Sequence, residues 1–162
     1  MQALQEAREE DGETQLHKPQ SDQSFEIFVK SLKDNSKGLN LPAGYVPSTT
    51  LWLIDDDEVI GRIRIRHYLT EQLKQNGGHI GYYIRPSKRN MGYGNRILQL
   101  GLMETKKLGI KKALLTCENS NLGSIKIIES NGGILDDTQE RDGKEKLRRY
   151  WIDINHNSSS YW

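Results

Sequence analysis

The sequence of 162 residues has little cysteine, no long apolar run and almost no excess charge of either sign. Because Cys117 is the only cysteine, the chain can build neither a disulfide framework nor a zinc site of several thiolates. No apolar run approaches the roughly 20 residues that span a bilayer, and the first residues lack the apolar core of a signal peptide. The 23 basic and 22 acidic side chains leave a formal charge of +1, which argues against nucleic-acid binding. We therefore expect a cytoplasmic protein with neither a membrane nor a nucleic acid among its partners.

The composition suits one polar globular domain. Hydrophobic residues make up 35% of the chain and charged residues 28%, and a chain of this length can bury one substantial core. The sequence has no internal repeat and no domain boundary, so we expect residues 1–162 to form a single domain. At its ends we expect a polar, acidic segment with a short helix over residues 1–20 and a mobile tail, rich in Ser and Asn, over residues 155–162.

Hydrophobic periodicity predicts an alternation of helices and strands. Helical spacing of apolar residues predicts helices over residues 24–34, 92–108 and 122–130. Strand-like runs cover residues 49–54, 58–66, 79–84, 111–117 and 147–154, and a further strand begins at residue 133. We expect loops over residues 35–48 and 67–78 and a charged hairpin loop over residues 136–144. The three aspartates at 55–57 suggest a cation site, but between two strands a solvated turn is the simpler interpretation.

The most informative stretch covers residues 79–96, which combine a strand, a basic loop and the start of a helix. Pro86 ends the strand because it lacks a backbone donor. Gly92 and Gly94 allow the backbone to approach a ligand closely, and the helix N-terminus that follows offers free N–H groups that suit a phosphate. A Walker loop is excluded because Asn95 and Arg96 follow the second glycine, and a dinucleotide-binding fingerprint is excluded because Ile97 stands where its third small residue belongs.

Two motifs, in the expected order and on the expected elements, then give a resemblance to a known family. Arg89-x-x-Gly92-x-Gly94 resembles the pyrophosphate-binding motif of the GCN5-related N-acetyltransferases (GNAT). The segment from Asn121 through Ser124 to Gly132 resembles the family's second cofactor segment, and the likeness covers roughly residues 49–154. It implies an α/β (α+β mixed sheet) GNAT acyl-CoA N-acyltransferase fold: a central, mostly antiparallel sheet with splayed parallel central strands, flanked by helices. The central tract looks like that of a group of predicted bacterial acetyltransferases.

The resemblance implies acetyl-CoA as the acetyl donor, bound where the strands over 79–84 and 111–117 splay apart, and no metal. Backbone groups of Tyr82 and Ile84 would pair with the pantetheine arm, and the Ile84 amide would polarise the thioester carbonyl. Asn121 would contact the cofactor or fix its loop, with Ser124 nearby. The pyrophosphate would be wrapped by the loop and first helical turn, which comprise Arg89, Asn90, Met91, Gly92, Tyr93, Gly94, Asn95 and Arg96.

The catalytic groups are less well defined by the sequence. Three residues are candidates for the base that removes a proton from the attacking ammonium: His79, His67 and Glu118. His79 stands where many relatives have a glutamate, although a strand-end histidine bonded to a neighbouring carbonyl is the simpler interpretation. The family's tyrosine acid is replaced by Ile128, so Tyr82, Tyr83 or water would have to take that role, or none is needed. Cys117 ends an apolar strand, where packing is the usual role of a cysteine.

The leading interpretation is an N-acetyltransferase that moves an acetyl group to a primary amine of a small metabolite or protein. The alternative is a non-catalytic sensor or interaction module that binds acyl-CoA, and a nucleic-acid-binding role is third. The sequence does not identify the acceptor, and the basic residues Arg62, Arg64, Arg66 and Lys88 favour a carboxylated amine only slightly. Relatives open with a strand that is not evident here, and the uncovered sheet edge predicts a homodimer.

Overall fold

The computed structural model describes residues 24–155. The predictions for residues 1–20 and for the tail beyond residue 155 lie outside the described part. The helices are α2 (Phe25–Ser36), α3 (Glu71–Gln75), a 3₁₀ turn η1 (Pro86–Lys88), α4 (Tyr93–Lys107) and α5 (Leu122–Ser130). The strands are β1 (Ser48–Asp55), β2 (Glu58–Arg66), β3 (Ile80–Ile84), β4 (Lys112–Glu118), β5 (Ile134–Arg141) and β6 (Lys144–Asp153). Between residues 24 and 155 no helix has the length and apolar character that crossing a membrane requires.

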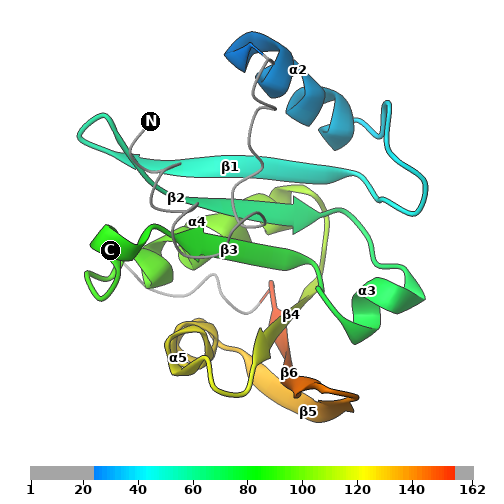
Figure 1. The fold of residues 1–162 in the computed structure, drawn as a ribbon, viewed down its shortest axis with the longest axis vertical. Coiled ribbons are helices and arrows are strands. Elements are labelled where there is room, and N and C mark those ends of the chain that lie inside the picture. Colours follow the sequence, from blue (N-terminus) through cyan, green and yellow to red (C-terminus); the bar gives the residue numbers. More distant parts are fainter. Residues whose placement is uncertain (1–23, 156–162) are drawn as a thin grey trace.

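The first sheet is antiparallel in the order β1-β2-β3 and separates two layers of helix (Figure 1). Side chains alternate across β2, so Ile63 and Ile65 are buried on one face while Arg62, Arg64 and Arg66 lie on the other. Helix α4 packs so closely on the isoleucine face that a Cβ built on Gly101 would lie 2.1 Å from Ile63 Cδ1. Helix α2 covers the β1 part of the arginine face, with the Phe28 and Trp52 ring centroids 6.2 Å apart.

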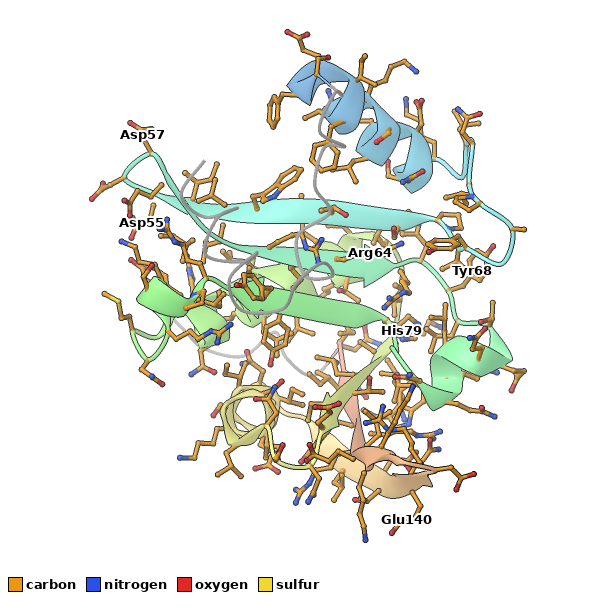
Figure 2. The ribbon with its side chains drawn as sticks, viewed as in Figure 1. Asp55, Asp57, Arg64, Tyr68, His79 and Glu140 are labelled. Atoms are coloured by element: carbon orange, nitrogen blue, oxygen red, sulfur yellow. The ribbon has the colours of Figure 1, made fainter. Side chains whose placement is uncertain are left out.

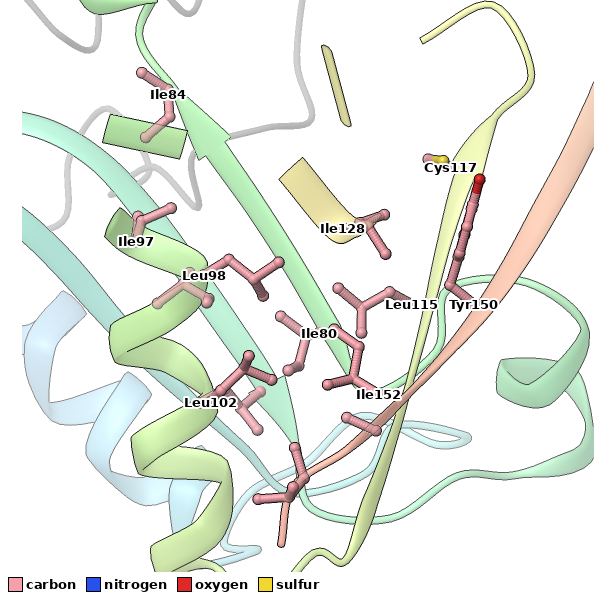
Figure 3. Close-up of a cluster of buried hydrophobic side chains, with 14 of the residues drawn as sticks. Ile80, Ile84, Ile97, Leu98, Leu102, Leu115, Cys117, Ile128, Tyr150 and Ile152 are labelled. Atoms are coloured by element: carbon pink, nitrogen blue, oxygen red, sulfur yellow. The ribbon is translucent and has the colours of Figure 1, made fainter. Parts of the chain in front are cut away.

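The second sheet is also antiparallel, in the order β4-β6-β5. Tyr150 and Ile152 of β6 and Leu115 of β4 are almost completely buried in it. Figure 3 shows these side chains converging with Ile80 of β3 and Leu98 of α4. One hydrophobic cluster therefore joins both sheets.

The two sheets meet at the start of β3 and then diverge (Figure 1). The His79 amide donates to the Leu114 carbonyl over 2.7 Å. Gly78 has φ +60° beside this contact, and a Cβ on it would lie 2.3 Å from the same carbonyl oxygen. In the part of the chain that the structure describes, β3 and β4 share no strand ladder beyond this point. The strands over 79–84 and 111–117 are therefore joined at one end and separated at the other.

Two of the predicted loops contain secondary structure. The connection over residues 67–78 includes α3, which begins where the Thr70 hydroxyl caps the Leu73 amide. The predicted charged hairpin loop over residues 136–144 is mostly strand, because β5 continues to Arg141 and the turn is confined to Asp142 and Gly143. Its charges are exposed and paired across the hairpin, as in Arg149–Asp137 and Lys146–Glu140. Because β5 is exposed along almost its whole length, it lacks the apolar alternation on which the sequence prediction relied.

Candidate active site

The outer edge of β3 presents backbone groups to the region where the sheets diverge. Arg66 donates its amide to the His79 carbonyl, and Arg85 donates its amide to the Ile60 carbonyl, so residues at odd positions of β3 pair with β2. Antiparallel pairing alternates along a strand. The N–H and C=O groups of Tyr82 and Ile84 therefore point away from β2, toward the side on which β4 lies.

The loop between β3 and α4 ends in a glycine that leaves space over the helix N-terminus. Gly92 is the N-cap of α4 and adopts φ +86°, and a Cβ built on it would meet nothing within 4 Å. Gly94 has a different role, because a Cβ there would lie 2.4 Å from Ile127 Cδ1. The second glycine of the motif thus allows α4 to pack on α5. At Gly92 the lack of a side chain leaves the open space that the sequence pattern suggested for close approach of a ligand.

Side chains anchor this loop to the first sheet. Arg89 Nε donates to the Ile84 carbonyl at 3.0 Å, and its guanidinium carbon lies 5.4 Å from the centroid of the Tyr83 ring. Lys88 forms a 2.6 Å ion pair with Glu58, and the Tyr93 hydroxyl donates to Asp55 at 2.5 Å.

Asp55, at the end of β1 and labelled in Figure 2, and Glu58, at the start of β2, therefore help to position the loop. This role is not evident from the sequence, because Tyr93 and Asp55 are 38 positions apart and Lys88 and Glu58 are 30 positions apart. Only the opposite charges of Lys88 and Glu58 could have suggested their contact. The other candidate residues of the loop and first helical turn are largely exposed: Asn90, Met91, Asn95 and Arg96.

The N-terminus of α5 is linked to β3 by a short chain of hydrogen bonds. Asn121 is the N-cap, and its Oδ1 accepts from the Ser124 amide at 3.0 Å. The Ser124 hydroxyl lies 2.8 Å from the Tyr82 hydroxyl, and burial raises the pKa of Tyr82 to about 12. Asn121 thus fixes its own loop, and Tyr82 stays a neutral phenol. Burial also raises the pKa of the Cys117 thiol, which suits a packed side chain.

His79 lies at the point where β3 meets β4, labelled in Figure 2. Its Nδ1 accepts a hydrogen bond from the Leu114 amide at 3.0 Å, so with its own amide bond to the Leu114 carbonyl it clips the two strands together. Burial, followed by the charge of Arg66, lowers the pKa of His79 to about 4. The neutral ring with its proton on Nε2 has no free lone pair, because Nδ1 is already used. This geometry favours a structural role for His79. Its ring is bonded to a backbone amide, whereas the sequence suggested a bond to a backbone carbonyl.

The other two base candidates contact other side chains. His67 Nε2 lies 2.9 Å from Thr49 Oγ1, and burial lowers the pKa of its ring. Glu118, at the end of β4, is exposed and 3.3 Å from Arg141. Ile128 is buried in the apolar cluster. Within residues 24–155, no group of three or more His, Cys, Asp or Glu could hold a metal ion.

Comparison with solved structures identifies the class of fold. An N-acetyltransferase from Staphylococcus aureus Mu50 superposes with a TM-score of 0.63 at 15% identity, covering 94% of this chain and 89% of that one. A putative acetyltransferase, yncA, from Salmonella typhimurium, solved with its cofactor acetyl-CoA, has a TM-score of 0.59 at 13% identity and covers 82% and 73%. A spermidine N-acetyltransferase chimera from Vibrio cholerae and hSSAT has a TM-score of 0.60 at 14% identity and covers 83% and 77%. The fold is that of the GNAT acetyltransferases, as predicted.

The sequence itself supplies the family. Residues 2–132 match the model described as the acetyltransferase (GNAT) family. A search of curated protein sequences found no match. This chain belongs to the GNAT family of acetyltransferases, which confirms the resemblance drawn from its two motifs.

Proposed function

We propose that the protein transfers an acetyl group from acetyl-CoA directly to a primary amine of a small metabolite or protein. The observation that carries this proposal is the open edge of β3 beside a glycine-capped helix N-terminus. Tyr82 and Ile84 turn their backbone groups toward that edge, and the space over Gly92 is free of protein atoms. These residues fit a cofactor with an extended amide arm and a pyrophosphate. Bound there, acetyl-CoA would supply an acyl thioester that an amine can attack.

Each of these groups then has a defined task. The backbone of β3 would hold the pantetheine arm as an added strand is held. The Ile84 amide would donate to the carbonyl oxygen on which negative charge develops. Free N–H groups in the first turn of α4 would bind the pyrophosphate, and the positive end of the helix dipole favours that charge. Arg89, held beside Ile84, would add a cation.

Proton transfer requires groups outside the His79 clip. We propose that Glu118, His67 or water accepts the proton of the ammonium, since the imidazole of His79 is engaged with Leu114. The Tyr82 hydroxyl, hydrogen-bonded to Ser124, is the group best able to donate a proton to the departing thiolate. Rates for Glu118→Gln, His67→Asn and Tyr82→Phe would rank these roles, because loss of a general acid or base costs about 10²- to 10⁴-fold.

Acetyl-CoA binding by calorimetry tests the proposal. Arg89→Ala should weaken binding by about 1.5–3 kcal/mol if the guanidinium contacts phosphate, while Lys106→Ala on the exposed side of α4 should not. Gly92→Val should abolish binding, and Gly143→Val is its matched control. Both glycines have positive φ and open space, but Gly143 lies in the β5–β6 turn. Failure of the wild type to bind acetyl-CoA would contradict the proposal.

The alternative is a sensor that binds acyl-CoA without transferring it, which the replacement of the family's tyrosine by Ile128 favours. A panel of amines, assayed by release of free CoA, separates the two functions. Binding without turnover on any amine would favour the sensor.

A further inference from the structure

The arginine face of β2 holds a buried cation whose donors are not satisfied. Arg62 is only 9% exposed, and its Nε and Nη1 atoms are buried with no hydrogen-bond partner among residues 24–155. Burial, and after it the charges of Arg64 and Arg66, lowers the pKa of Arg62 to about 10. Among residues 24–155, no carboxylate is a cause of this shift in the pKa of Arg62. Buried polar groups are normally paired, and a buried charge without a counter-charge is costly.

The location of Arg62 connects this cation with the proposed transfer site. In the register of the first sheet, Arg62 lies opposite Tyr83 and Arg64 lies opposite Gly81. Tyr83 directly precedes Ile84, whose amide is the proposed donor to the thioester carbonyl. Adjacent strands are about 4.8 Å apart, so the backbone of Arg62 lies one strand away from that amide.

The same face is open at one position beside Arg64. Gly81 is exposed, and a Cβ built on it would meet nothing within 4 Å. Arg64, labelled on β2 in Figure 2, stands across from this open position. On the other side of β2, Trp52 lies opposite Arg62 and packs against Phe28 of α2. This face of β2 is thus covered beside Arg62, where Trp52 and the buried Tyr83 are its cross-strand neighbours, and open beside Arg64, at Gly81.

We propose that the amine acceptor carries an oxyanion, a carboxylate or a phosphate, and that the Arg62 guanidinium binds it. The inference rests on the proposed acetyl transfer and adds the chemical class of the acceptor. A guanidinium presents two parallel N–H donors that match an oxyanion. Such a pair lies on the Nε/Nη2 edge or on the Nη1/Nη2 edge, and each edge includes one of the two unsatisfied donors, Nε or Nη1. Arg64 and Arg66 add positive charge on the same face, which disfavours a polyamine.

Matched acceptors test this class. Wild type is assayed with α-amino acids against their amides, with O-phosphoethanolamine against ethanolamine, and with spermidine. The expected result is a preference of at least tenfold in kcat/KM for one anionic member over its neutral partner, and the pair that shows it separates carboxylate from phosphate. Equal rates within each pair, or a preference for spermidine, would overturn the inference.

Variants then assign the preference to Arg62. Arg62→Met should raise KM for the anionic acceptor by about 10- to 100-fold, which is the loss expected for a hydrogen bond to a charged group. The KM for the neutral partner and the Kd of acetyl-CoA should both stay within twofold of wild type. Arg62→Lys keeps the charge but lacks the planar pair of N–H donors, so its KM for the anionic acceptor should lie between those of wild type and Arg62→Met. Lys106→Met, which removes an exposed charge from α4 on the opposite face, is the control. An unchanged KM in Arg62→Met would overturn the inference.

The two proposals fail in different ways. If no acetyl-CoA binds, the proposed function fails. If acetyl-CoA binds and amines are acetylated without an anion preference, only this inference fails. The acidic residues Glu6, Glu9, Glu10, Asp11 and Glu13 lie outside the described residues and are a candidate counter-charge in the sequence. Changing all five to Gln in the full chain should leave KM unchanged. A fall in KM of tenfold or more would assign the partner of Arg62 to that segment and overturn the inference.

Discussion

The His79 clip makes the stability of the protein depend on pH in a predictable direction. The pKa of His79 is lowered from 6.5 to about 4 in the folded chain. Between these values the unfolded chain binds the proton more strongly, so stability rises with pH across this window. The contribution is complete above pH 6.5 and is lost as the pH falls toward 4. At about 1.36 kcal/mol per pKa unit, the shift corresponds to about 3 kcal/mol.

Two substitutions separate the titration from the hydrogen bond. His79→Asn places a side-chain oxygen near the position of Nδ1, so it can still accept from the Leu114 amide but does not titrate in this range. His79→Leu removes the acceptor and leaves a buried N–H unsatisfied, at a cost of about 1–3 kcal/mol. Urea unfolding at pH 4, 5, 6, 7 and 8 gives the free energy of unfolding for each protein.

We expect the pH-dependent gain of about 3 kcal/mol to shrink in both variants relative to wild type, and His79→Asn to be more stable than His79→Leu at pH 7. An equal pH dependence in wild type and His79→Asn would refute the assignment of this pH-dependent gain to His79. Acetyl-transfer rates provide a second check. A clip predicts that His79→Asn stays within about tenfold of wild type, whereas loss of a catalytic base would cost about 10²- to 10⁴-fold.

Three further predictions concern packing, the hydrogen bond between α5 and β3, and assembly. Gly101→Ala should destabilise the protein by about 1–3 kcal/mol through overpacking, because the new Cβ meets the buried Ile63, whereas Gly123→Ala on exposed α5 should be neutral or stabilising in the same urea titration. Ser124→Ala should lower the free energy of unfolding by about 1 kcal/mol and shift the phenol titration of Tyr82. Ultraviolet absorbance measures that titration, and Ser130→Ala is the control. In residues 24–155, β1 pairs with a strand on one side only, so light scattering should give the mass of a homodimer, and a monomer mass would contradict that proposal.

Local sequence features determined most of the elements and the family. Apolar spacing located α2, α4 and α5 to within about two residues at each end, because one face of each helix is buried. The spacing of Arg89 and Gly92 and the Asn cap at 121 are local requirements of a loop that feeds a helix. The prediction that β3 has an open edge came from the family resemblance, and the register of β2 and β3 agrees with that prediction.

Tertiary contacts decided what individual residues do. The sequence offered His79 as a base, but the Leu114 backbone, 35 positions away, takes its lone pair. Gly94 matched a ligand-binding motif, but its small size serves the contact with Ile127. The alternation of Arg and Ile along β2 was visible in the sequence, yet only the folded sheet shows that Arg62 is buried without a partner. Periodicity follows from which face of an element is buried, whereas the protonation, pairing and space around one side chain depend on residues distant in the sequence.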